Sequence, residues 1–161
     1  MKAFETRPYR YYPGANLYVE RQAYVFDLVE APQGRGLDRA REAVEEVFPG
    51  LLKPEPDGPA ALFANTLLHD LKMDINLSVD RCCVRRREKG WRIAVECVDR
   101  RITERCVDAV EAWFNAAEDG RRHDFGKVFG ELQQKFDRSL LGGPTIYSLY
   151  EGARKRRIGW I

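Results

Sequence analysis

The stretch from Ala60 to Leu77 places the strongest constraint on the fold, because it is the longest segment of the chain with helical periodicity. Its apolar side chains recur at intervals of three and four residues, the spacing that places side chains on one face of an α-helix. These side chains are Ala64, Leu67, Leu68, Leu71 and Ile75. A polar stripe runs beside them at the same spacing and consists of Asn65, His69, Lys72 and Asn76. The pattern predicts an amphipathic helix whose polar stripe either faces solvent or lines a site.

The rest of the chain predicts four strands and four further helices. Strands rich in aromatic and β-branched residues are expected at 2–10, 17–29, 81–87 and 91–98, with a turn at 11–16. Helices are expected at 37–48, 102–117, 125–136 and 145–157, and a surface loop with three prolines at 53–59. The last two strands should form a β-hairpin around Lys89-Gly90, and Asp99 or Thr103 should cap the helix that follows. This order indicates an α+β fold, a small and mainly antiparallel sheet packed with four to five helices, as a single domain over residues 1–161.

The composition is that of an ordinary soluble protein. The chain has 161 residues, of which 44% are hydrophobic and 32% charged, which is enough to bury one core. No apolar run approaches the roughly 20 residues that span a bilayer, and the first residues contain no hydrophobic signal core. We therefore expect a cytoplasmic protein with no membrane partner.

The four cysteines argue against a zinc-ribbon site. They are Cys82, Cys83, Cys97 and Cys106, and none of them forms a CxxC pair. We expect reduced, mostly buried thiols.

Several common function classes lack their sequence signatures. The formal net charge is only +2, and no RRM, KH or helix-turn-helix pattern is present, so we expect no nucleic-acid partner. The sequence also contains no Walker A motif and no GxSxG nucleophile elbow.

Three parts of the chain resemble, in order, the N-terminal domain of cyanophycin synthetases. The first is the turn Pro13-Gly14-Ala15-Asn16-Leu17-Tyr18, where the family has a similar Gly-Pro-Asn-aromatic turn. The second begins at Phe48-Pro49-Gly50-Leu51 and continues through the central helix, the hairpin and the next helix. The third comprises Leu141-Gly142-Gly143-Pro144-Thr145-Ile146-Tyr147-Ser148-Leu149, Ala153 and Arg156-Arg157-Ile158. It is similar to the family's Leu-Gly-Pro-Ser-Thr, Ser-Ile and Ala-x-x-Arg-Gly-Ile-Pro run, so that residues 135–161 resemble the segment leading into an ATP-grasp domain.

Cyanophycin synthetases are ATP-dependent ligases that build a polymer of aspartate carrying arginine branches. The resemblance implies that this chain is a non-catalytic domain that tethers such a polymer, with ligase domains in cis as its partners. ATP and Mg²⁺ would act only in those ligase domains, which lie outside these 161 residues. We therefore expect that the chain alone forms no amide bond and needs no cofactor. Two alternatives stay open: a metal-dependent amide hydrolase that cleaves cyanophycin, and a homo-oligomeric scaffold for the ligase.

The hydrolase alternative depends on the central helix. Some family members carry an HxxEH-like motif there, in which two histidines bind Zn²⁺ and the glutamate is the general base. Aligned on this chain, the motif falls on Asn65-Thr66-Leu67-Leu68-His69, so Asn65 replaces a histidine and Leu68 replaces the glutamate. Asparagine is a poor zinc ligand and leucine cannot move a proton. We therefore expect a degenerate site without zinc, and His69 remains as a weak catalytic candidate.

Binding residues are expected on a surface of mixed charge, because the polymer carries carboxylate and guanidinium groups. The predicted partners of carboxylates are Arg85, Arg87, Arg92, Arg100 and Arg101, and the predicted partners of guanidinium groups include Glu88 and Glu96. Asn65, His69 and Lys72 of the central helix complete the predicted set. The alternative for each residue is an ordinary solvated side chain.

Overall fold

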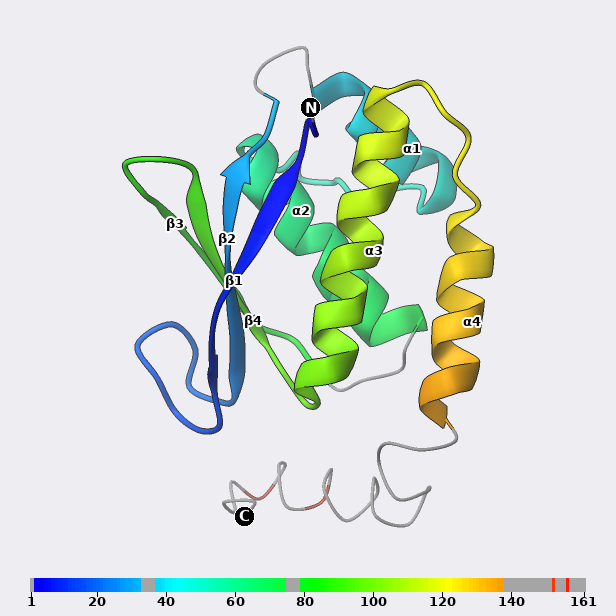
Figure 1. Cartoon of the computed structure of the whole chain (residues 1–161). Coiled ribbons are helices and arrows are strands. Elements are labelled where there is room, and N and C mark those ends of the chain that lie inside the picture. The colour runs from blue at the N-terminus through cyan, green and yellow to red at the C-terminus, as the bar shows by residue number, and fades with distance from the viewer. Residues whose placement is uncertain (1, 33–36, 75–78, 138–151, 153–155, 157–161) are drawn as a thin grey trace.

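The helices that the structure describes lie on one side of a four-stranded sheet (Figure 1). The computed structural model describes residues 2–32, 37–74 and 79–137, together with 152 and 156. The strands are β1 (Glu5–Tyr12), β2 (Ala23–Glu30), β3 (Cys82–Arg86) and β4 (Trp91–Glu96). The helices are α1 (Asp38–Val47), α2 (Gly58–His69), the π-helix η2 (Asp70–Asp74), α3 (Arg100–Glu118) and α4 (Phe125–Asp137). All strand pairs are antiparallel, in the order β1-β2-β4-β3, so the predicted α+β class is confirmed.

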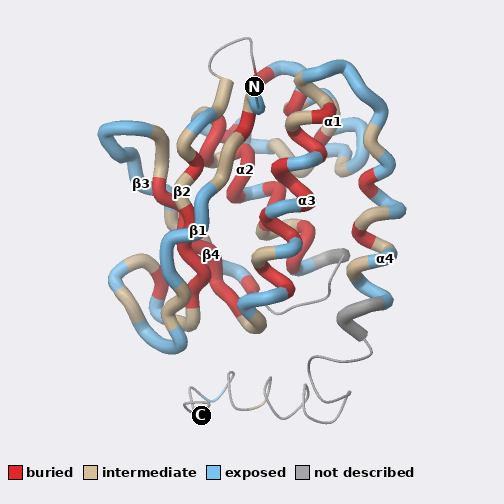
Figure 2. The backbone as a smooth tube through the Cα atoms, in the orientation of Figure 1, coloured by how far each residue is buried: buried red, intermediate tan, exposed pale blue. Residues whose placement is uncertain are grey.

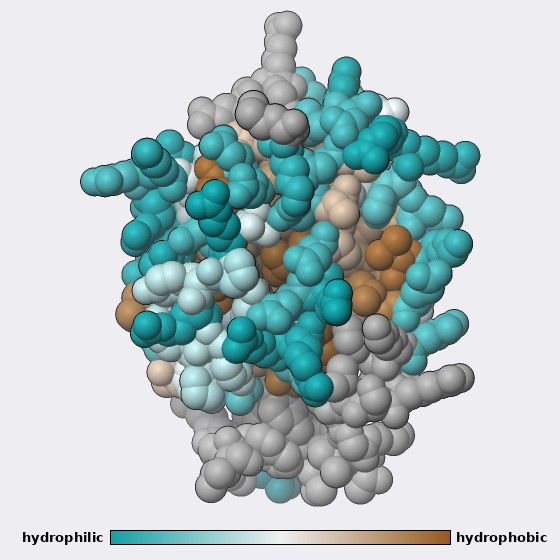
Figure 3. Space-filling model, in the orientation of Figure 1, coloured by the Kyte–Doolittle hydropathy of each residue, from teal (hydrophilic) through white to brown (hydrophobic). Residues whose placement is uncertain are grey.

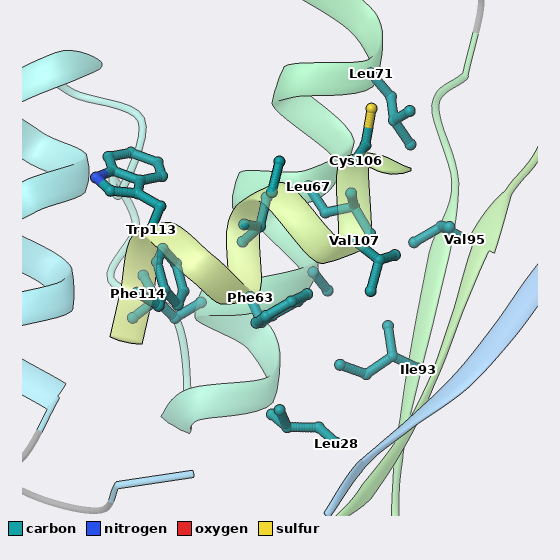
Figure 4. Close-up of a cluster of buried hydrophobic side chains, with 14 of the residues drawn as sticks. Leu28, Phe63, Leu67, Leu71, Ile93, Val95, Cys106, Val107, Trp113 and Phe114 are labelled. Carbon is teal, nitrogen blue, oxygen red and sulfur yellow. The ribbon is translucent and has the colours of Figure 1, made fainter. Parts of the chain in front are cut away.

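The hydrophobic core fills the space between the sheet and helices α2 and α3 (Figure 4). Alternate residues of the central strands, among them Leu28, Ile93 and Val95, point from the sheet toward the helices. On the helical side, the rings of Phe63 and Phe114 meet edge to face with their centroids 5.6 Å apart. Figure 2 shows that the buried residues concentrate along this interface. Helix α4 packs outside this layer, against α3 and η2.

The predicted central helix exists, with a change of helical type inside it. Helix α2 begins at Gly58, so Pro59 belongs to its first turn and not to the preceding loop. Proline is tolerated there because the N–H of a first-turn residue has no partner within the helix. At Asp70 the α-helix gives way to η2. Ala64 and Leu67 are fully buried, in agreement with the predicted apolar stripe. The predicted end of the helix, from Ile75 onward, lies outside the described residues.

The prediction of a strand at 17–29 is wrong over its first six residues, because β2 begins only at Ala23. The side chain of Asn16 explains the difference. Its Nδ2 donates to the carbonyl oxygens of Gly14 (3.0 Å) and Arg21 (2.8 Å). Its Oδ1 accepts the backbone N–H groups of residues 18 and 19, at 2.9 and 3.0 Å. These bonds close the segment into a loop, which a local alternation of side chains does not reveal.

Strand β1 runs from Glu5 to Tyr12, so the predicted strand at 2–10 begins three residues too early, and the prediction of a turn at residues 11 and 12 is wrong. Tyr11 pairs with Tyr24 and Tyr12 pairs with Ala23 of β2. The added cross-strand pairs extend β1 beyond the point at which the Pro-Gly signal suggested a turn.

Two side chains of α3 hold the beginning of the chain against the helical layer. Asn115 Oδ1 accepts the N–H of Phe4 at 2.8 Å, and Asn115 Nδ2 donates to the carbonyl of Phe4 at 2.9 Å. Glu111 accepts the N–H of Thr6 at 2.9 Å and pairs with Lys2 Nζ at 2.7 Å. These bonds satisfy backbone groups that would otherwise be desolvated at the sheet edge.

The other predicted elements are confirmed where the structure describes them. Helices α1, α3 and α4 begin and end within two residues of the predicted bounds. Asp99 caps α3, because its Oδ1 accepts the N–H groups of Arg101 (2.8 Å) and Ile102 (3.2 Å). The predicted helix at 145–157 lies outside the described residues, apart from 152 and 156. Within the described ranges, no helix is long and apolar enough to cross a bilayer.

The four cysteines lie in different environments. Cys97 and Cys106 are buried, whereas Cys82 and Cys83 are half-buried. Burial raises the pKa of the Cys97 thiol to about 12, and a contact of 3.3 Å with the Thr103 hydroxyl opposes this shift.

Asn115→Ala should lower the free energy of unfolding by about 2 kcal/mol, because both backbone groups of Phe4 lose their partners. Urea denaturation measures this loss. Asn65→Ala is the matched control, since it removes an exposed amide from α2, and it should change stability by less than about 0.5 kcal/mol. Equal stabilities of the two variants would contradict the role assigned to Asn115.

The raised pKa of Cys97 predicts a loss of stability in alkali. The unfolded thiol ionises near its usual pKa of 9, whereas the folded thiol stays protonated up to about 12. This contribution to stability is therefore complete below pH 9 and is lost as the pH rises toward 12. Urea midpoints between pH 8 and pH 11 should fall less steeply for Cys97→Ala than for the wild type or for Cys83→Ala. Parallel slopes for all three proteins would refute this assignment.

Candidate binding site on the hairpin

Strands β3 and β4 form the predicted hairpin, and their pairing is regular throughout. The register runs from Cys82 opposite Val95 to Arg86 opposite Trp91. The pairing continues at the turn, where the N–H of Arg87 donates to the carbonyl of Gly90 at 3.0 Å. Residues 88 and 89 therefore form a two-residue turn, which fixes the register of every side chain on the hairpin.

Gly90 allows the hairpin to approach β2 closely. Its φ is +76°, in the left-handed region that favours glycine. A Cβ atom at this position would lie 2.1 Å from the carbonyl oxygen of Leu28. The turn thus brings the charged residues of the hairpin next to β2.

Arg92 occupies the middle of the sheet face that points away from the helices. Its Nε and Nη2 donate to the two oxygens of Asp27 at 2.7 and 2.8 Å. Its guanidinium carbon lies 3.4 Å from the centroid of the Tyr9 ring. The two hydrogen bonds that Arg92 donates to the Asp27 carboxylate raise the pKa of Arg92 above its usual range. Since Arg92 is only 7% exposed, its main role is to join β2 and β4.

The three consecutive arginines at the end of β3 and directly after it have different surroundings. Arg85 donates to the carbonyl of Leu17 at 2.7 Å and lies over the ring of Tyr18, 4.7 Å from its centroid. Arg86 lies over the ring of Trp91 at 4.4 Å. Arg87 is exposed and forms no ion pair with any described residue. Residues 82–96 carry five basic and two acidic side chains, a formal charge of +3.

A pocket of about 690 Å³ opens at the end of this hairpin. Its lining is charged and consists of Asp27, Arg86, Arg87, Glu88 and Lys89. The hairpin projects from the helical layer in Figure 1, and the same region is covered by hydrophilic side chains in Figure 3. Such a lining suits a ligand with charged groups better than an apolar small molecule.

Of the predicted binding residues on the outer sheet surface, Glu96 is occupied within the fold. It accepts Arg21 Nη1 at 3.0 Å and the N–H of Asp80 at 2.9 Å, and it is only 3% exposed. Arg100 and Arg101 begin α3 and lie outside the pocket lining. Arg100 pairs with Glu104 at 2.9 Å, and Arg101 lies 3.6 Å from Asp99.

The predicted residues of the central helix lie in the helical layer, on the other side of the sheet from Asp27 and Arg92. Asn65 is exposed, and Lys72 pairs with Asp80 at 2.7 Å. The half-buried ring of His69 packs edge to face on Phe48, with the centroids 4.5 Å apart. Among the residues that the structure describes, no three His, Cys, Asp or Glu side chains come together as metal ligands would.

The structure thus brings Arg87 and Glu88 together and separates them from the other predicted residues. Sequence reasoning missed Asp27, Arg86 and Lys89 in the pocket. The alternation of a strand assigns Arg86 and Arg87 to opposite faces, but the pocket lies where β3 ends, and both side chains line it. The two-residue turn at 88–89 was the signal that could have pointed to this site.

The fold and the pocket define the chain as an α+β domain with a basic hairpin and a charged pocket. A scan against known protein families finds no match to this chain, and a search of curated proteins finds none.

Gly90→Ala should lower the free energy of unfolding by about 2–4 kcal/mol, because it combines a strained φ with a collision against backbone. Thermal or urea unfolding measures the effect. Gly130→Ala is the control, since its Cβ would meet nothing within 4 Å in α4, and it should stabilise the protein by about 0.5–1 kcal/mol. A neutral Gly90→Ala variant would contradict the close approach described above.

Proposed function

We propose that this chain is a binding domain for an extended polyamide that carries carboxylate and guanidinium groups, of the aspartate–arginine type made by cyanophycin synthetases. The observation that supports it most is the pocket at the end of the hairpin, which is lined by three cationic and two anionic side chains. A lining with both signs of charge can pair with both kinds of group on one ligand. In this proposal the bound polymer is held for ligase domains in cis.

The lining residues have different roles in the proposal. Arg87 and Lys89 are exposed and form no ion pair with any described residue, so they can meet carboxylates without breaking an internal bond. Glu88, at the tip of the turn, can meet a guanidinium group. Asp27 is held by Arg92 and serves mainly to fix the wall of the pocket. Binding at exposed charges requires little desolvation, which favours this part of the surface.

The proposal places binding on the hairpin and not on α2. Lys72 already pairs with Asp80, and the ring of His69 is packed on Phe48. The hairpin gathers more charge over a shorter length of chain, with a net +3 over residues 82–96. This positive excess attracts the carboxylates of the proposed ligand.

The proposal is tested with the double variant Arg87→Glu and Lys89→Glu. Calorimetric titration with a short synthetic aspartate–arginine oligomer should show binding to the wild type and binding weakened roughly tenfold or more by the double variant. The control is Arg105→Glu with Lys127→Glu, which makes the same change of net charge on exposed helical residues. This control should bind like the wild type.

Other outcomes distinguish the alternatives. Equal weakening by the two double variants would mean that only overall charge matters, and the pocket would have no part in binding. Equal or tighter binding of a single-stranded oligonucleotide would favour a nucleic-acid partner. Release of short fragments from the oligomer, followed by mass spectrometry, would support the amide hydrolase in place of the binding domain.

A further inference from the structure

The two edges of the sheet differ in regularity. Strand β1, at one edge, contains Pro8, and its pairing with β2 shifts between residues 5 and 6 and between residues 8 and 10. Prolines and bulges of this kind are devices that block the addition of another strand. Strand β3, at the other edge, has no proline, and all five of its pairs with β4 are in register.

The backbone groups on the free edge of β3 follow from its hydrogen bonds to β4. The N–H of Arg87 donates to Gly90, and the N–H of Glu96 donates to Arg81, at 3.0 and 2.8 Å. In an antiparallel pair, every second residue directs both of its backbone groups to the partner strand. Residues 81, 83, 85 and 87 therefore face β4, and the residues between them, Cys82, Val84 and Arg86, face away from it. No described residue pairs with this side of β3.

This edge is accessible at the end that approaches the pocket. Val84 is 37% exposed, and Arg85 and Arg86 are exposed as well. Arg86 belongs both to the free edge and to the lining of the pocket. The edge and the pocket therefore form one continuous surface.

We propose that a carboxylate-rich extended polyamide binds to β3 as a fifth strand and places a charged group in the pocket. This inference rests on the proposed function and specifies how the ligand is held. Backbone hydrogen bonds to Val84 and its outward-facing neighbours give affinity, and the arginines select an acidic chain.

The charges of the edge favour this occupant over a second copy of the protein. A carboxylate-rich chain beside β3 places opposite charges next to Arg85, Arg86 and Arg87. Pairing of β3 with β3 of another copy would gather two such runs of arginine in one ribbon, where like charges on neighbouring strands are destabilising. Charged residues on an edge strand act against self-association in the same way.

Amide hydrogen exchange followed by NMR tests the proposed alternation directly. In the free protein, the N–H groups of Cys83 and Arg85 should be protected and those of Val84 and Arg86 should exchange quickly. Saturating oligoaspartate should slow the exchange of Val84 and Arg86 by roughly tenfold or more, because each forms a new backbone bond. Uniform changes along β3, or changes in the side-chain signals of the hairpin alone, would overturn the proposal.

Val84→Pro provides a second test. It removes an N–H that faces the free edge, so the pairing of β3 with β4 stays intact. Binding of oligoaspartate should weaken roughly tenfold or more, while Val84→Thr, which keeps the N–H, should bind like the wild type. Circular dichroism and urea denaturation serve as the check that both variants fold. An unchanged affinity in a folded Val84→Pro protein would overturn the proposal.

The result for Val84→Pro also separates this inference from the proposed function. If the Arg87→Glu, Lys89→Glu variant loses binding and Val84→Pro keeps it, the pocket binds the ligand and strand addition is wrong. If neither variant loses binding, both proposals are wrong. A wild-type dimer that Val84→Pro converts to a monomer, seen by light scattering, would assign the edge to a second copy.

Discussion

The structure depends on the burial of one face of a four-stranded sheet by helices α2 and α3. That burial supplies the large apolar interface of the protein, with Leu28 and Ile93 on one side and Phe63 on the other. Since the described helices all lie on this side, the opposite face must be stabilised by other means. Part of it is covered by the loop that Asn16 organises, and part is held by an ion pair. This loop and this ion pair determine which polar side chains remain exposed on the face of the sheet opposite the helices.

The pairing of Arg92 with Asp27 shows how charges that hold the sheet together differ from charges that stay exposed. Arg92 is nearly buried and directs Nε and Nη2 to one carboxylate, so it serves the pairing of β2 with β4. Its removal would leave the half-buried carboxylate of Asp27 without its partner. Arg87 has none of these constraints. Arginines with the same charge and only five positions apart in sequence thus have different roles because their burial differs.

The sequence predicted the elements whose causes are local. The hairpin is set by a two-residue turn and by alternation, and α3 is set by its cap at Asp99 and its apolar periodicity. Prediction from the sequence failed where contacts between residues far apart in the chain determine the structure. The loop before β2 exists because Asn16 bonds across it, and the pocket exists because β2 brings Asp27 beside a hairpin that lies some 60 residues later in the chain. Neither arrangement leaves a pattern within a short window of sequence. The cyanophycin synthetase resemblance stays a prediction, as does each role that it implies.

The central helix α2 is mostly buried, whereas the hairpin tip is exposed to water. Seven of the twelve residues of α2 are buried, and Leu68, at the position of the general base in the hydrolytic motif, packs against the core. A carboxylate there would lose hydration beside apolar side chains. At the hairpin tip, the side chains of Arg87 and Lys89 are exposed to water. Charged side chains therefore stay hydrated on the hairpin, which extends away from the helices, whereas α2 serves mainly to pack the core (Figure 1).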